Sequence, residues 1–173
     1  MTSERIGDRG RWISTVVERY ERPLLRYAAQ ITGDIERGRD VVQDTFLRLC
    51  TQDRSSLDNH LAEWLYTVCR NRALDVRRKE NRMKTLTVEQ VAEQESREPN
   101  QPAATEQQET AQRVLRFVQG LSENQREVVR LKFQNGLSYR EISAITQLSV
   151  SNVGYLIHTA IRKLRAELGA DHD

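Results

Sequence analysis

Apolar residues recur at intervals of three and four positions along three stretches of the first half of the chain, a spacing that predicts amphipathic helices. The first stretch covers residues 12–31 and stops where Gly33 interrupts the pattern. The second covers about residues 35–50, and the third runs from about residue 61 to residue 84, where apolar positions give way to basic ones. Pro23 lies inside the first stretch, so we expect that helix to kink or to restart there.

The second half of the chain shows two helix-start signals and a tight turn. Ser122 followed by Gln125, and Ser138 followed by Glu141, are capping patterns that predict two helix N-termini. A short turn at residues 147–149 then leads into a longer helix. The longer helix carries an unbroken apolar stripe of Val150, Val153, Ile157, Ala160 and Leu164. A short helix, a turn and a longer helix form the helix-turn-helix pattern, and a plain helical hairpin is the alternative interpretation.

The segment between these halves differs in composition. Residues 85–112 contain two of the three prolines, are rich in Glu and Gln and include no aromatic residue, so they lack the side chains that build a core. We expect a linker, flexible or only partly helical, between domains of residues 1–84 and 113–173. With only 8 Gly and 3 Pro in 173 residues, the expected fold class is all-α, with two small helical domains joined by this linker.

The small net charge of +2 hides a division along the chain. Residues 1–84 carry 17 Lys and Arg against 13 Asp and Glu, and residues 113–173 carry nine against six, so both are basic. The linker carries one Arg against six Glu, a net charge of −5. Because Lys and Arg neutralise phosphates, two basic modules favour a nucleic-acid partner, with the acidic linker between them.

Several other functions are disfavoured by the residues present. No apolar run approaches the ~18 residues of a membrane span, and the N-terminus lacks the apolar region of a signal peptide. Cys50 and Cys69 are too few for a disulfide framework, which favours reduced thiols and a cytoplasmic protein. His60, His158 and His172 are scattered, and no spacing matches a metal site, a phosphate-binding loop or a nucleophile elbow. We therefore expect a binding protein without a cofactor, not an enzyme.

The helix-turn-helix provides the first set of candidate contacts, because the start of its second helix enters the major groove. Asn152 has the amide that pairs with an adenine edge, an interaction typically worth about 1 to 3 kcal/mol of discrimination. Arg162 and Lys163 lie farther along the helix and suit phosphates, which supply affinity without sequence information. The residues expected nearest to base edges are Ser149, Ser151, Asn152 and Tyr155.

The basic end of the third helix provides the second set. Trp64 and Tyr66 lie upstream of a run of Arg and Lys, a combination that suits single-stranded or melted DNA, where bases stack on aromatic rings. The alternative places Trp64 in the core of a helix end that simply faces solvent. Asp75 and Arg78, three positions apart, are expected to form a local ion pair.

Four segments together resemble the sigma factors of bacterial RNA polymerase, in particular the extracytoplasmic-function (ECF) group. ERPLLRYAAQITGD (residues 21–34) and RDVVQDTFLRL (39–49) are similar to the start of the family's region 2. AEWLYTVCRNRALDVRR (62–78) is similar to its promoter-melting part, and residues 121–165, beginning LSENQREVVRLKFQNGLSYREI, are similar to region 4. The resemblance implies a non-catalytic, dissociable subunit that gives core RNA polymerase its promoter choice.

The resemblance also assigns roles to residues. Region 2 within residues 1–84 implies recognition and melting of the minus-ten element, with the loop of residues 52–59 capturing an extruded base at a cost of a few kcal/mol. Region 4 within residues 113–173 implies recognition of the minus-thirty-five element as duplex by the helix-turn-helix residues given above. The surface for the clamp helices of the largest polymerase subunit corresponds to Asp40, Gln43, Asp44, Phe46 and Leu47. The minus-ten contacts correspond to Trp64, Arg70, Asn71, Arg77 and Arg78.

The resemblance further implies a linker that threads toward the RNA exit path of the polymerase, and often an anti-sigma partner, although no segment identifies one. In one respect the chain departs from the family. Relatives commonly carry basic residues at four positions that are apolar or small and uncharged here: Gly154, Leu156, Thr159 and Ile161. We therefore expect DNA binding by this module to depend only weakly on salt concentration, or Leu156 to face a protein partner. Two alternatives remain at this point: a stand-alone helix-turn-helix regulator of duplex operators, and a first module that serves only dimerisation or protein interaction.

Overall fold

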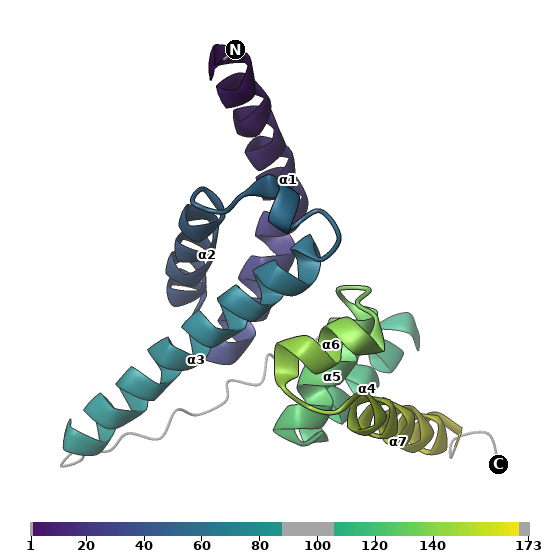
Figure 1. Ribbon diagram of the computed structural model, residues 1–173. Helices are drawn as coiled ribbons and strands as arrows, with labels where there is room; N and C mark the ends of the chain where they lie inside the picture. Colours follow the sequence, from purple (N-terminus) through teal and green to yellow (C-terminus); the bar gives the residue numbers. More distant parts are fainter. Residues whose placement is uncertain (1, 88–105, 170–173) are drawn as a thin grey trace. The chain divides into compact units, whose positions relative to one another are not determined.

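The protein is described by a computed structural model that covers residues 2–87 and 106–169, with side chains for residues 7–83 and 111–167. Within these residues the chain forms seven α-helices and a short 3-10 turn, and no strand. It divides into two compact units between Gln90 and Val91, and each unit has its own core (Figure 1). The expected all-α fold with two helical domains is therefore confirmed.

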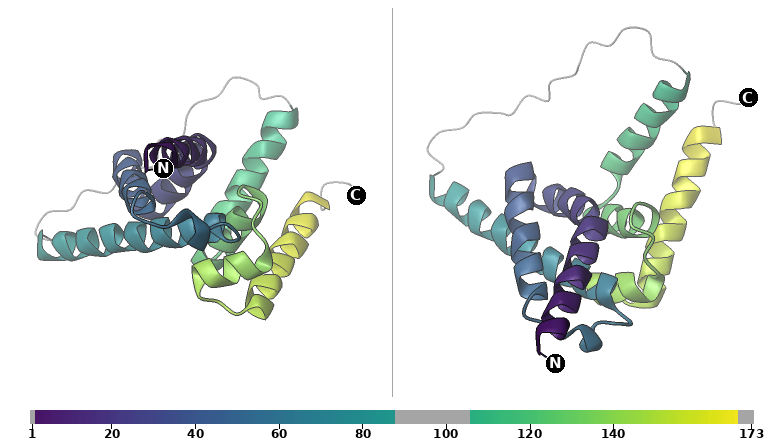
Figure 2. Two further views of the ribbon diagram at one scale, coloured as in Figure 1. Left: turned by 45° about the horizontal axis from the view of Figure 1, so that its top comes forward. Right: turned by 90° about the horizontal axis from the view of Figure 1, so that it is seen from above.

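The first unit consists of α1 (Thr2–Thr32), α2 (Ile35–Leu49), the 3-10 turn η1 (Arg54–Ser56) and α3 (Leu61–Thr87). These three helices pack against one another in every pairing, as the two further views also show (Figure 2). The sequence places the turn between α1 and α2 through Gly33, whose φ of +76° suits glycine. Asp34 then caps α2 by accepting a hydrogen bond from the Arg37 amide at 2.9 Å.

Helix α1 differs from the expectation in two ways. It begins at Thr2, well before the first periodic apolar residue, and it continues without a break past Pro23. The expectation that the helix restarts at Pro23 is thus wrong. Proline removes one backbone hydrogen bond, but buried residues lie on both sides of it, Val16 before it and Leu24 and Ala28 after it, so packing stabilises both halves of the helix.

The cores of the units form from the predicted apolar stripes. In the first unit, Tyr27 and Tyr66 meet edge to face with ring centroids 5.4 Å apart. Leu24 and Leu65, which are close to these tyrosines in the sequence, are fully buried. Gly38 of α2 allows a close approach of α1, because a Cβ atom there would lie 3.0 Å from the backbone nitrogen of Ala29. Glycine at this position is therefore a packing requirement.

The second unit consists of α4 (Glu106–Gly120), α5 (Glu123–Phe133), α6 (Tyr139–Thr146) and α7 (Val150–Gly169). Helix α4 begins inside the segment expected to be linker, so residues 106–112 are helical. The remaining acidic stretch, residues 88–105, lies outside the described residues.

Local capping positions the helix-turn-helix. The Ser138 hydroxyl accepts from the Glu141 amide at 3.2 Å while the Glu141 carboxylate accepts from the Ser138 amide at 2.7 Å, which completes the predicted capping box. Gln147, at φ +64°, ends α6 in the left-handed conformation. The Ser149 hydroxyl then accepts from the Asn152 amide at 3.1 Å and starts α7. The second predicted cap also forms, as Ser122 accepts from the Gln125 amide at 3.3 Å.

Candidate functional site

The face of α2 that the resemblance points to is exposed. Asp40, Gln43 and Leu47 lie along its outer side, and the Leu47 side chain is 59% exposed. Phe46 and Asp44 lie at the two edges of this face: Phe46 is half-buried against α1, and Asp44 meets α3. All five predicted residues therefore lie on one helix. Three of them face outward only, whereas Phe46 and Asp44 also contact neighbouring helices.

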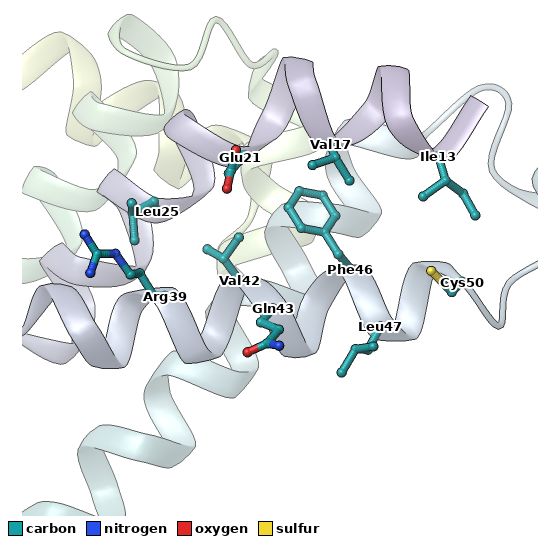
Figure 3. Close-up of a pocket in the computed structure, with 10 residues that line it drawn as sticks. All are labelled: Ile13, Val17, Glu21, Leu25, Arg39, Val42, Gln43, Phe46, Leu47 and Cys50. Atoms are coloured by element: carbon teal, nitrogen blue, oxygen red, sulfur yellow. The ribbon is translucent and has the colours of Figure 1, made fainter. Parts of the chain in front are cut away.

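Phe46 belongs to an apolar groove of about 460 Å³ between α1 and α2. Figure 3 shows its ring pointing from α2 toward Val17 of α1, while Gln43 and Leu47 extend from the outer side of α2. Glu21 and Arg39 add one charge of each sign to a lining that is otherwise largely apolar. The groove is lined by Ile13, Val17, Glu21, Leu25, Arg39, Val42, Gln43, Phe46, Leu47 and Cys50.

Asp44 has a partner inside the unit. Its carboxylate lies 2.6 Å from Nε of Arg72 on α3, and both side chains are only about one third exposed, at 39% and 34%. A second ion pair, Arg37 with Glu80, joins the same two helices. The resemblance assigned Asp44 to the polymerase surface alone, and the structure adds that this carboxylate ties α2 to α3.

On α3, the predicted minus-ten residues fall on two adjoining faces. Trp64, Asn71 and Arg78 follow one another at seven-residue steps and so share a face, while Arg70 and Arg77 lie together beside it. Asn71 and Arg78 are exposed, and Trp64 and the other two arginines are half-buried. The expected ion pair between Asp75 and Arg78 is present at 2.8 Å.

Tyr66 does not lie on this surface. Its side chain is 2% exposed, and burial, with smaller effects of Cys69 and Tyr20, raises its pKa above the usual range for tyrosine. The expectation that Tyr66 offers an aromatic face to DNA is therefore wrong, because the ring packs on Tyr27 in the core. Trp64 is half-buried, an exposure between the two predicted for it, a ring that stacks on DNA bases and a ring in the core.

In the second unit, the start of α7 carries the predicted duplex contacts on its exposed side. Ser151, Tyr155 and Arg162 share one stripe of the helix, and the Tyr155 side chain is 67% exposed. His158 lies on the same stripe and is exposed. It follows Ser151 by seven positions, or two helical turns, and this spacing was the signal available in the sequence. All six predicted residues are exposed: Ser149, Ser151, Asn152, Tyr155, Arg162 and Lys163.

The positions that depart from the family are mostly not on this exposed stripe. Thr159 is buried at 9% exposure, and Ile161 lines a groove against α4 and α5. Gly154 faces the Tyr139 ring, and Leu156 is half-buried. Thr159 and Ile161 therefore do not face DNA, because their helical phase turns them to the interior of the unit.

A groove of about 490 Å³ between α4, α5 and α7 was not predicted from the sequence. Phe133, which is 60% exposed, and Leu164 contribute to its apolar lining, and Arg130 and Arg165 also line it. Among the described residues the Arg130 Nε is a buried atom without a hydrogen-bond partner, and burial lowers the pKa of this side chain, with a smaller effect of Arg126. The signal available in the sequence was Phe133, an aromatic residue at the end of a largely polar helix.

The described residues contain no cluster of three or more His, Cys, Asp or Glu side chains that could hold a metal ion. In the same part of the chain, no helix combines the length and the apolar character needed to span a bilayer. Cys50 is exposed, whereas Cys69 is buried, and burial raises the pKa of its thiol to about 12 despite a hydrogen bond with Thr45.

Comparison with known proteins agrees with this division. Residues 16–83 match Sigma-70 region 2 and residues 111–164 match Sigma-70, region 4. The ECF RNA polymerase sigma factor SigM of Bacillus subtilis is 25% identical over 154 residues, covering 89% of this chain and 93% of the relative. SigL of Mycobacterium tuberculosis, also an ECF RNA polymerase sigma factor, is 30% identical over 149 residues, covering 84% and 82%.

Two solved structures are similar in fold. The sigma factor RpoE from Bartonella quintana, solved with the anti-sigma factor NepR, gives a TM-score of 0.66 at 22% identity, covering 92% of this chain and 98% of that one. CnrH, solved with the cytosolic domain of CnrY, gives 0.58 at 27% identity, covering 94% and 90%. Matches to both region 2 and region 4 do not favour a stand-alone helix-turn-helix regulator. The chain belongs to the extracytoplasmic-function group of RNA polymerase sigma factors, which bind core RNA polymerase and direct promoter-specific initiation of transcription.

Proposed function

We propose that the three surfaces described above divide the work of initiation. The outer face of α2 binds the clamp helices of the largest subunit of core polymerase. The exposed face of α3, together with residues 52–59, recognises and opens the minus-ten element, and α7 reads the minus-thirty-five element as duplex. The observation that carries the first assignment is that the exposed Leu47 lies with Phe46 in the lining of the apolar groove, because a contiguous exposed apolar surface is available to a protein partner.

The functional class is binding, with no reaction of its own. Members of the family act with RNA polymerase, so we place this chain in the cytoplasm, where the polymerase works. Two structural relatives were solved with partner proteins, NepR as an anti-sigma factor and the cytosolic domain of CnrY. We extend the first of these relations to this chain and propose that an anti-sigma protein holds it inactive.

The polymerase surface is tested with a pair of matched variants of α2. Leu47→Ala and Ile35→Ala both shorten an exposed apolar side chain of the same helix, at 59% and 47% exposure, but the two positions lie on different faces. We expect Leu47→Ala to weaken binding to core polymerase by about tenfold, the value of burying part of one leucine. Ile35→Ala leaves this affinity unchanged. Equal effects of the two variants would contradict the assignment.

The duplex-binding surface of α7 is tested by comparing how two variants lose DNA affinity. Asn152→Ala is expected to relax base preference at one position of the minus-thirty-five element, because an amide contact to a base edge carries sequence information. Arg162→Ala is expected to weaken all sequences alike and to reduce the salt slope by about 1, because a phosphate contact releases counterions. Binding of a randomised duplex pool by the holoenzyme, followed by sequencing at two salt concentrations, measures both. An Asn152→Ala holoenzyme that keeps every base preference would refute the base contact.

A further inference from the structure

The segment between α2 and α3 is held by residues from the start of α1. Nη2 of Arg9 donates hydrogen bonds to the carbonyl oxygens of Cys50 and Gln52, each at 2.7 Å. These carbonyls lie at the C-terminal end of α2 or just beyond it, where backbone oxygens lack partners within the helix and the helix dipole favours a cation. One guanidinium nitrogen therefore ties the beginning of the segment to a helix more than 40 positions away in sequence.

A second side chain makes the tie from the opposite direction. Arg54, in η1, lies with its Cζ 5.7 Å from the centre of the Trp12 ring, and its Nη1 lies 3.3 Å from the Asp8 carboxylate. Its Nε also lies 3.9 Å from the carboxylate of Asp58 in the same segment. Figures 1 and 2 both show the segment passing beside the N-terminal half of α1. Two arginines thus join the segment to α1: Arg9 extends from α1 to the segment, and Arg54 extends from the segment to α1.

Within the segment, internal contacts define the shape between these ties. Asp53 caps η1 by accepting from the Ser55 amide at 3.2 Å, and its carbonyl accepts from the Ser56 hydroxyl at 2.7 Å. Leu57 is buried at 2% exposure and anchors the far end. Ser55 and Asn59 are exposed, so the segment presents polar side chains outward from a backbone held on its inner side.

We propose that Arg9, with Asp8 and Trp12, forms a clamp that sets the conformation in which residues 52–59 read the minus-ten element. This proposal rests on the proposed function, in which that loop captures an extruded base. Arg9 is then a positioning residue: it touches the loop backbone and acts on DNA only through the loop. The first turns of α1, which the sequence patterns did not assign to any element, acquire a role in promoter selectivity.

The size of the effect follows from the population of the competent loop. A ligand that binds one conformation loses apparent affinity in proportion to the fraction of molecules in that conformation. If the unclamped loop is competent in roughly a tenth to a third of molecules, binding of the captured base weakens by about three- to tenfold. Because both hydrogen bonds come from one nitrogen, the single ammonium of Arg9→Lys can donate both, and we expect it to restore most of the affinity.

The experiment uses holoenzyme assembled from core polymerase and the full chain, with a randomised pool of single-stranded DNA as the probe. Bound DNA is sequenced to give the base preference at each position. Four variants are compared with the parent: Arg9→Ala, Arg9→Lys, Arg11→Ala and a loop variant combining Ser55→Ala with Asn59→Ala. Arg11 is an exposed arginine two positions from Arg9 on the same helix, so its removal changes the net charge equally without touching the loop ties. Affinity for core polymerase and the melting temperature are measured for each.

The expected result is that Arg9→Ala and the loop variant flatten the same base preference by about three- to tenfold, while Arg9→Lys and Arg11→Ala keep it. Core affinity stays at the parental value throughout. If the loop variant flattens a preference that Arg9→Ala keeps, the clamp is overturned and the base-capturing loop stands. If the loop variant leaves every preference of the parent intact, the base-capturing role fails and the clamp fails with it. A uniform loss across all positions in Arg9→Ala, with weaker core binding, would mean a merely structural role and would also overturn the clamp.

Discussion

Two glycines inside helices are expected to respond to alanine in opposite directions. Gly154 lies in α7 with ordinary helical geometry, and a Cβ atom there would meet the Tyr139 ring at 3.6 and 3.8 Å, which is normal van der Waals contact. Gly38 lies in α2, and a Cβ atom there would lie 3.0 Å from the nitrogen and 3.2 Å from the Cα of Ala29. One site has room, and the other meets the backbone of a neighbouring helix.

The magnitudes follow from helix propensity and from packing. Alanine is more favourable than glycine in a helix by up to about 1 kcal/mol, so Gly154→Ala is expected to stabilise the second unit by roughly 0.5 to 1 kcal/mol. Gly38→Ala gains the same propensity, but overpacking against backbone that cannot rotate away typically costs about 1 to 3 kcal/mol. The net effect on the first unit is destabilisation.

Hydrogen exchange of the full chain is the assay, because it reports on each unit separately. Trp12 and Trp64 both lie in the first unit, so tryptophan fluorescence in denaturant follows Gly38→Ala but not the second unit. For Gly154→Ala, the buried amides of Val153 and Ile157 are expected to exchange about two- to fivefold more slowly. Faster exchange in Gly154→Ala, or an unfolding midpoint raised by Gly38→Ala, would refute the reasoning from close approach.

Four further predictions concern capping, thiol labelling, titration and pairing. Ser138→Ala should destabilise the second unit by about 1 kcal/mol, since the capping box is lost; it is measured as faster exchange of α6 amides, and unchanged exchange would contradict the capping role. Iodoacetamide should modify Cys50 and spare Cys69 in the native protein. Burial raises the pKa of the Cys69 thiol from 9.0 to about 12, so the contribution of the protonated thiol to stability is present below pH 9 and is lost as the pH rises toward 12. The difference in unfolding free energy between the parent and Cys69→Ala should therefore shrink from pH 9 to pH 12. A difference that stays constant over this range would contradict the raised pKa. A double-mutant cycle of Asp44→Ala and Arg72→Ala should give a coupling of about 0.5 to 1 kcal/mol that falls with added salt, whereas additive single effects would show that the pair contributes nothing.

Elements whose signals are local could be predicted from the amino-acid sequence. The apolar period placed α2 at Ile35–Leu49 to within a residue or two, and Ser138 with Glu141 placed the start of α6. The exposed stripe of α7, including Asn152 and Tyr155, followed from the same kind of pattern. These succeed because helical periodicity and capping involve residues only three or four positions apart.

For the candidate sites, local patterns pointed to the exposed start of α7 and to the basic end of α3, and both assignments stay predictions. The face of α2 had no assignment from periodicity, because an exposed polar face is equally consistent with simple solvation, and it acquired one through the family resemblance. The ties from Arg9 to the loop connect positions more than 40 residues apart, and no short spacing announces such a contact.

Outcomes that depend on a neighbouring helix could not be predicted in this way and emerged from the packing of the units. Pro23 lies inside an unbroken helix because packing on both sides of it offsets one missing hydrogen bond. Asp44 pairs with Arg72 because α3 passes beside α2. Gly38 and Gly154 look alike in the sequence, yet one faces backbone at 3.0 Å and the other an aromatic ring at 3.6 Å. The physical reason is common to all three: short-range forces act over a few ångströms in space, and which residues come within that range is set by how the helices pack.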